Sequence, residues 1–372
     1  MIGRQIENSI KETIFKGKAI ILIGARQVGK TTLLKKIFSG NDEVLWMNGD
    51  EPDIQKLFED VTSTRFKAII GQKKIIIIDE AQRIENIGLR LKLIIDALPA
   101  VQVVATGSSS FELANKVNEP LTGRKWEFRL YPLSFAELVN HHGLIEEKRL
   151  IKHRLVFGYY PDVVNNYGQE KDVLRLLSES YLYKDVLSWE NIQKPEKLTR
   201  LLQALALQVG CQVSYNELGQ MCSLDSKTVE KYVNVLEQTY IVFRLPSFSR
   251  NLRNELKSSR KIYFHDNGIR NAVLASFNQF ETRTDTGALW ENFLVSERLK
   301  KQAYTGIWAN NYFWRTREQK EIDFIEDSDQ KLSAFEFKWS PAQKIKSGRI
   351  FSETYGTDPI VVHSENFDDF LL

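Results

Sequence analysis

The sequence predicts an α/β fold that starts with an open parallel sheet, and three observations lead to this prediction. Residues 18–24, KAIILIG, form an apolar run of strand length, and TLLKKIF follows after a short loop with apolar residues at helical spacing. Further on, KKIIIIDEAQ contains four consecutive isoleucines, which is typical of a parallel central strand buried on both faces. Other strand-like segments (EVLWMNGDE, VQVVATGSSS, WEFRLYPLSF) alternate with helix-like ones up to residue 135.

Chain length and composition limit the number of domains and the class of protein. A chain of 372 residues is expected to hold about two to three domains, and its 42% hydrophobic and 27% charged residues are typical of a globular protein. The charged N-terminus has no signal-peptide core, no apolar run approaches the roughly 20 residues of a membrane span, and two cysteines cannot form a disulfide framework. We therefore expect a cytoplasmic protein with no membrane partner. The net charge of +3 is too small to indicate nucleic-acid binding by itself.

The loop after the first strand reads GARQVGKTT and matches the phosphate-binding pattern G-x-x-x-x-G-K-[ST] in its required strand–loop–helix context. Glycines let backbone N–H groups surround phosphate oxygens, and the following helix N-terminus adds partial positive charge. Lys30 is expected to reach the β- and γ-phosphates of ATP, and the Thr31 hydroxyl to bind Mg²⁺. The predicted ATP-binding residues are Gly24, Ala25, Arg26, Gln27, Val28, Gly29, Lys30, Thr31 and Thr32.

Two carboxylates end the isoleucine-rich strand. Because ligands of open parallel sheets bind at the carboxyl ends of the strands, Asp79 and Glu80 are expected to lie near the phosphate-binding loop. Asp79 fits the residue that holds the magnesium shell, and Glu80 fits the base that polarises an attacking water. The sequence therefore predicts a P-loop NTPase sheet with a Mg²⁺–ATP site.

Two further polar positions have alternative interpretations. Ser108 and its neighbour Ser109 follow the strand VQVVATG, and they either contact the γ-phosphate or cap the next helix. Arg124, in the loop LTGRKWEF, either completes the active site of a neighbouring subunit or is an ordinary surface arginine. The first interpretation of Arg124 predicts a homo-oligomer.

In this order, GARQVGKTT, IIIIDEAQ, ATGSSS, LTGR and YPLSFAEL resemble the AAA-type ATPases (AAA+ superfamily) of bacteria and archaea that carry a C-terminal domain of unknown function. The resemblance extends over essentially the whole chain. It implies an ATPase core followed by a winged helix and a restriction-endonuclease-like module. One departure is GYYPDVV at 158–164, where the family usually has two glycines before the aromatic residue and the proline. We expect this segment to be a structural turn.

Two further regions are expected in the middle of the chain, a helical one and a winged helix. Residues 136–208 show apolar residues at helical spacing and are expected to form the lid of the ATPase core, residues 1–135. Residues 209–285 contain two helices joined by a tight turn and then two strands around a basic loop, which is a winged-helix pattern. The second helix is expected to bury Val229, Val233 and Leu236. The candidate DNA-binding residues are Lys227, Lys231, Arg250, Arg253, Lys257, Arg260 and Lys261, and the alternative is a surface that docks a protein.

Residues 286–372 are expected to form a small α/β nuclease-like domain. A helical Glu291, Asp323 on a strand, and Glu336 with Lys338 on the next strand make up a PD-(D/E)xK constellation. Asp323 and Glu336 would share Mg²⁺, and Lys338 would orient the attacking hydroxide. The alternative is a surface salt bridge on a domain that binds without cutting.

Three functions follow from these patterns. The first is Mg²⁺-dependent ATP hydrolysis coupled to DNA binding or remodelling by an oligomer. The second is a nucleotide-controlled signalling or assembly switch whose C-terminal domains bind proteins. The third is an ATP-dependent DNA nuclease.

Overall fold

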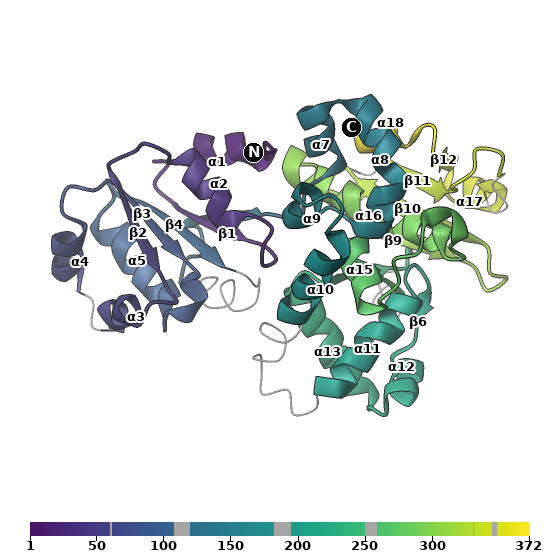
Figure 1. The fold of residues 1–372 in the computed structure, drawn as a ribbon, viewed down its shortest axis with the longest axis horizontal. Helices are drawn as coiled ribbons and strands as arrows, with labels where there is room; N and C mark the ends of the chain where they lie inside the picture. The colour runs from purple at the N-terminus through teal and green to yellow at the C-terminus, as the bar shows by residue number, and fades with distance from the viewer. Residues whose placement is uncertain (60–61, 108–119, 182–194, 250–258, 330, 344–347) are drawn as a thin grey trace. The chain divides into compact units, whose positions relative to one another are not determined.

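The computed structural model describes residues 1–59, 62–107, 120–181, 195–249, 259–329, 331–343 and 348–372 (Figure 1). Internal contacts divide the chain into two compact units. The first contains Met1–Pro132 and Gln238–Tyr240, and the second contains Leu133–Glu237 and Ile241–Leu372. Within the described part of the chain, no helix is both long enough and apolar enough to cross a membrane.

The first unit is built on a five-stranded sheet with the order β2-β3-β4-β1-β5, and every neighbouring pair is parallel. The predicted α/β fold class is confirmed. Strands β1 and β4 are buried along their whole length, and β3 is buried up to Asp79 at its carboxyl end. The strands are β1 (Ala19–Ile23), β2 (Val44–Asn48), β3 (Ile75–Asp79), β4 (Gln102–Gly107) and β5 (Lys125–Arg129).

One hydrophobic core of this unit lies between the sheet and three helices. Ile21, Ile76 and Ile78 project from the strands and cluster with Phe58 and Phe66. Neighbouring residues in each strand point to the opposite face, as strand geometry requires. The helical elements are α1 (Ile6–Thr13), α2 (Lys30–Ile37), α3 (Pro52–Glu59), α4 (Ser63–Ile70), the 3-10 turn η1 (Ala81–Arg83) and α5 (Ile87–Ala97).

The second unit begins with helices and a small antiparallel sheet of order β6-β8-β7. Val229, Val233 and Leu236 are buried along α13, as their spacing predicts. The helices are α7 (Phe135–His142), α8 (Leu144–Phe157), α9 (Pro161–Asn165), α10 (Glu170–Tyr181), α11 (Pro195–Leu207), α12 (Tyr215–Cys222), α13 (Ser226–Gln238), α15 (Asn267–Val273) and η3 (Phe280–Thr282). The strands are β6 (Gln212–Val213), β7 (Val242–Pro246) and β8 (Arg260–Phe264).

Only the first part of the GYYPDVV segment is a turn: residues 158–160 connect α8 to α9, which begins at Pro161, and a buried carboxylate holds this turn. Asp266 accepts hydrogen bonds from the backbone N–H of Tyr159 (2.7 Å) and of Ile269 (3.0 Å), where it caps α15. Gly158 has φ +76°, and a Cβ there would lie 2.2 Å from Asp266 Oδ1. Only glycine therefore fits this position.

The C-terminal part of the second unit is a four-stranded sheet of order β12-β11-β10-β9 with the long helix α16. Phe313 and Trp314 of β9 are buried in this part of the chain. The elements are α16 (Thr286–Thr305), β9 (Asn310–Arg315), β10 (Glu321–Ser328), β11 (Lys331–Phe337), α17 (Gly348–Tyr355), β12 (Ile360–Val362) and α18 (Phe367–Leu371).

Candidate functional site

The predicted phosphate-binding loop connects β1 to α2. A Cβ on Gly24 would lie 2.1 Å from the carbonyl oxygen of Leu130, so only glycine allows this close approach. Gly29 has φ +96° and Gln27 has φ +59°, so the loop turns sharply before α2 begins at Lys30. The first N–H groups of a helix have no partner within the helix, which makes this end suitable for an anion.

Lys30 is folded into the loop. Its side chain is buried, and Nζ donates to the carbonyl oxygens of Gly24 (2.9 Å) and Ala25 (2.8 Å). Arg4 lies outside the motif. It donates to the carbonyl oxygens of Val28 (2.7 Å) and Tyr131 (2.6 Å) and so links the loop to the segment after β5. The ammonium group therefore already lies where the loop would surround phosphate oxygens.

Asp79 contacts the phosphate-binding loop directly. Thr31 Oγ1 donates to Asp79 Oδ2 at 2.7 Å, although the two residues are 48 positions apart. Thr106, buried on β4, donates to the other carboxylate oxygen of Asp79 and accepts from the Glu80 N–H at 3.2 Å. The Thr31 hydroxyl and the Asp79 carboxylate are hard oxygen donors of the kind that Mg²⁺ prefers, so these residues fit a magnesium site.

Glu80 adopts a left-handed backbone conformation, with φ +48°. A Cβ on Gly49 would lie 2.4 Å from the Glu80 carbonyl oxygen, so the backbone just after β2 approaches this turn closely. Gln82 Nε2 donates to Glu80 Oε2 at 2.5 Å and orients the carboxylate. Strained non-glycine residues of this kind concentrate at functional sites.

The sequence interpretation missed three contributors to this site, namely Arg4, Thr106 and Gln82. Thr106 carried a signal, because it is a polar residue near the carboxyl end of β4, the edge at which ligands of parallel sheets bind. No signal in the sequence indicated Arg4, since its contacts depend on the tertiary fold. Ser108 lies outside the described residues. Arg124 is partly exposed, at 45%, and its Nε lies 3.0 Å from Asp96 Oδ1 on α5.

Six of the seven candidate DNA-binding residues fall into three groups. Lys227 and Lys231 are exposed on α13. Arg260 lies over the ring of Tyr215, with 4.8 Å between its guanidinium carbon and the ring centroid. The remaining loop residues, Arg250, Arg253 and Lys257, lie outside the described residues.

The structure corrects the prediction for Lys261. Its side chain is only 1% exposed, because β8 directs it inward rather than into a basic loop. Nζ lies 2.8 Å from Glu291 Oε1 and 2.5 Å from Glu321 Oε1. A lysine held in this way is not available to DNA phosphates.

The predicted nuclease residues come together at one end of the C-terminal sheet. Glu291, Glu321 and Asp323 each bring a carboxylate oxygen within 4.8 Å of the others. Asp323 Oδ2 also accepts from the Phe337 N–H at 2.7 Å, and the pairing of β10 with β11 places it beside Glu336. Glu336 Oε1 lies 2.9 Å from Lys338 Nζ. Glu321 was missed in the sequence.

Burial and neighbouring charges shift the pKa values of this cluster. It raises the pKa of Glu291 to about 7, against the opposing effect of Lys261. It also raises the pKa of Glu336. For Lys261, burial favours the neutral amine, but the carboxylate of Glu291 and its neighbours outweigh it and raise the pKa well above its ordinary value. The lysine is therefore charged.

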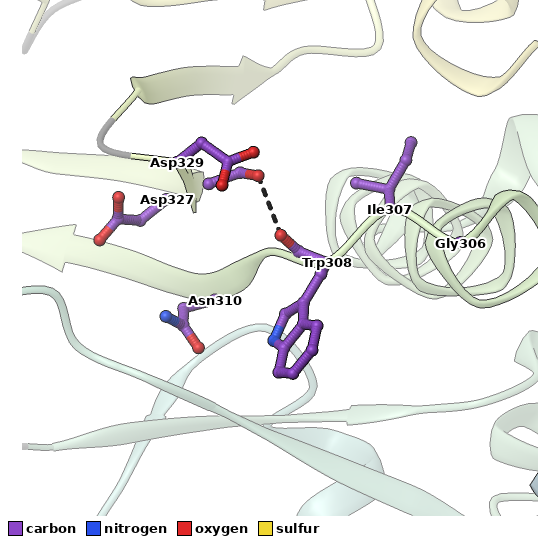
Figure 2. Close-up of a pocket in the computed structure, with 7 residues that line it drawn as sticks. Gly306, Ile307, Trp308, Asn310, Asp327 and Asp329 are labelled. Atoms are coloured by element: carbon purple, nitrogen blue, oxygen red, sulfur yellow. Dashed lines mark hydrogen bonds between the residues drawn. The ribbon is translucent and has the colours of Figure 1, made fainter.

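A separate hollow of about 560 Å³ lies beside the end of α16 (Figure 2). Trp308 in its wall is 90% exposed, so its indole does not pack in the hydrophobic core. Its carbonyl oxygen accepts from Ser328 Oγ at 2.9 Å. Figure 2 shows its indole pointing away from the carboxylates of Asp327 and Asp329, so these groups do not converge on one ligand position.

Comparisons with known families agree with the fold of the first unit. A family model described as an AAA domain matches residues 16–139. Two models described as domains of unknown function (DUF8612 and DUF4143) match residues 148–279 and 286–370. With the sheet order and the loop geometry, the first match identifies an AAA-type P-loop ATPase domain in the N-terminal third. The expected resemblance is confirmed at this level.

The relatives found have no described function. An uncharacterized protein of Mycobacterium tuberculosis is 24% identical over 334 residues, covering 88% of this chain and 72% of its own. An uncharacterized protein of Haemophilus influenzae is 25% identical over 406 residues, and the match covers 100% of this chain and 93% of that protein. Among solved structures, a Walker-type ATPase of Pyrococcus abyssi has a TM-score of 0.52 at 15% identity, covering 74% of this chain and 96% of its own. This last likeness shows the fold alone.

Proposed function

We propose that this protein hydrolyses Mg²⁺–ATP at the Gly24–Thr31 loop and couples hydrolysis to DNA binding or remodelling by its second unit. The observation that carries the first half is the contact between Thr31 and Asp79, with Glu80 following at the same edge of the sheet. The AAA-domain match to residues 16–139 supports it.

Each residue of the site has a chemical role in this proposal. On ATP binding, Lys30 exchanges its two carbonyl partners for phosphate oxygens. Thr31 and Asp79 would hold magnesium, which when bound offsets negative charge on the phosphates. Glu80 accepts a proton from the attacking water, and Gln82 orients its carboxylate.

Thr106→Val is expected to lower kcat by about 10–100-fold, because valine keeps the shape but removes the hydrogen bonds to Asp79 and to the Glu80 backbone. Phosphate release under saturating ATP measures this effect. Thr13→Val, which removes a hydroxyl bonded only to the Ile10 carbonyl, serves as the matched control and should leave kcat unchanged. Equal turnover in the two variants would mean that Thr106 does not support the site.

The domain boundaries form part of the proposal. We assign residues 1–135 to the ATPase core, 136–208 to a helical lid, 209–285 to a winged helix and 286–372 to a nuclease-like domain. The winged helix is supported by the succession of α11, β6, α12, α13 and the hairpin β7–β8. Exposed Lys227 and Lys231 on α13 would contact DNA phosphates.

We also propose that the protein acts as an oligomer. Arg124 is the residue that would complete the site of a neighbouring subunit, since its partner Asp96 is itself about half exposed and holds it weakly.

The decisive experiment measures ATP turnover with single-stranded, duplex and branched DNA in parallel. We expect stimulation by at least one DNA form and no turnover in Lys30→Ala with any of them. Turnover that ignores every DNA form would instead favour the signalling or assembly switch.

DNA affinity measured at several salt concentrations tests the role of α13. The double variant Lys227→Gln with Lys231→Gln is expected to weaken binding and to reduce the slope of log K against log salt concentration by about 0.9 per lost duplex phosphate contact. Lys171→Gln with Lys331→Gln removes the same charge from exposed positions elsewhere and should change neither quantity. Identical salt slopes for the two double variants would make this helix a protein-docking surface.

A further inference from the structure

The acidic cluster of the C-terminal sheet already contains a cation from another element. Lys261 comes from β8 of the three-stranded sheet, whereas Glu291 lies on α16 and Glu321 on β10. Its ammonium group hydrogen bonds to Glu291 Oε1 at 2.8 Å and lies 2.5 Å from Glu321 Oε1. It also lies 5.4 Å from the ring centroid of Phe313.

Neighbouring groups fix the carboxylates around this ammonium. Tyr263, two residues further along β8, donates its hydroxyl to the same Glu291 oxygen at 2.6 Å. On the other side, Arg315 Nε lies 3.4 Å from Glu321 Oε2. Glu291 and Glu321 are therefore both engaged by basic or hydroxyl groups of the chain itself.

The charges of the cluster nearly balance. Among the described residues, four carboxylates gather here with three basic groups: Glu291, Glu321, Asp323 and Glu336 with Lys261, Lys338 and Arg315. Removing Lys261 would leave the carboxylates in clear excess. Buried charges without partners are strongly unfavourable, so such an excess would attract another cation.

We infer that Lys261 takes the place of a divalent metal ion in this cluster, and that it fastens β8 to α16 and β10. The ammonium uses the Glu291 and Glu321 oxygens at hydrogen-bond distance, whereas Mg²⁺ would need oxygen ligands at about 2.0–2.1 Å. A metal ion would also be repelled by the ammonium charge at this short range. In this state the cluster cannot support metal-dependent cleavage.

This inference does not depend on ATP hydrolysis, and it opposes the nuclease hypothesis. That hypothesis expects Asp323 and Glu336 to share a metal ion in the wild-type protein. If Lys261 instead takes the place of the ion, the cluster should bind a metal ion only after Lys261 has been replaced.

The experiment measures Mn²⁺ binding by electron paramagnetic resonance to the nucleotide-free, full-length protein carrying Asp79→Asn, which removes the metal ligand of the ATP site. We expect no Mn²⁺ binding that depends on Asp323 in this background. Adding Lys261→Gln is expected to create such binding, with an affinity at least about tenfold above the Asp323-independent binding of the background, because a unit charge no longer opposes the ion. Adding Asp323→Asn as well should abolish it, and Lys261→Arg, which keeps the charge, should create none.

Two results would overturn the inference. One is Mn²⁺ binding by the Lys261 protein that disappears with Asp323→Asn. The other is a folded Lys261→Gln protein that gains no Mn²⁺ binding. If Lys261→Gln does not fold, the comparison of the Lys261 protein with and without Asp323→Asn decides the question: a difference overturns the inference and equality supports it.

Discussion

ATP turnover by the Glu80→Gln protein is expected to fall by about 10²–10⁴-fold while ATP binding is retained. The amide has nearly the shape of the carboxylate but cannot accept a proton from water. Its neighbour Gln82 can still bond to the remaining oxygen, so the strained turn at Glu80 should persist. The measurements are single-turnover phosphate release and the Kd of a fluorescent ATP analogue, made on the same preparation.

Two comparisons separate the loss of the base from other effects. Glu85→Gln makes the same chemical change at an exposed position five residues on and should leave turnover intact. Lys30→Ala should instead lose ATP binding, because Lys30 is the cation enclosed by the loop. Full turnover in Glu80→Gln, with binding unchanged, would show that another group activates the water.

The ATPase fold and most of its site could be predicted from the sequence because their signals are local. The apolar strand before GARQVGKTT and the helical spacing after it lie within 21 residues, and the motif itself names Lys30 and Thr31. Asp79 follows from the rule that polar residues at the carboxyl ends of parallel strands share one edge. The contact of Asp79 with Thr31 bears out that reasoning.

The remaining features could not be predicted because they depend on packing between distant elements. Lys261 follows a run of basic residues and looks like part of a charged loop. Its burial becomes evident only once β8 pairs with β6 and β7 and meets Glu291, 30 positions away. Glu321 was missed because a single polar residue on a strand has no distinguishing pattern.

A second large effect is expected from Glu297→Ala, which should lower the free energy of unfolding of the second unit by about 3–5 kcal/mol. Glu297 and Lys300 form a buried ion pair on α16, with 2.6 Å between Oε1 and Nζ. The carboxylate also accepts from the Phe135 N–H at 2.8 Å, and Lys300 donates to the Leu133 carbonyl at 2.9 Å. These contacts fasten the start of α7 to α16.

Burial raises the pKa of Glu297 even though Lys300 is adjacent, so the pair does not fully recover the free energy of desolvation. Removing only the carboxylate leaves the Lys300 ammonium buried without its counter-ion, and that is the source of the large loss. Urea unfolding followed by tryptophan fluorescence measures it.

Glu297→Gln separates the contribution of charge from that of hydrogen bonding. The amide still offers an oxygen to the Phe135 N–H, so its loss should be smaller than that of alanine but still clear, because the ammonium remains unneutralised. Glu353→Ala removes the partner of Arg349 in an ion pair whose side chains are 63% and 90% exposed, and it should leave unfolding unchanged. Equal unfolding curves for Glu297→Ala and Glu353→Ala would mean that α16 does not hold the segment at Leu133–Phe135 through this pair.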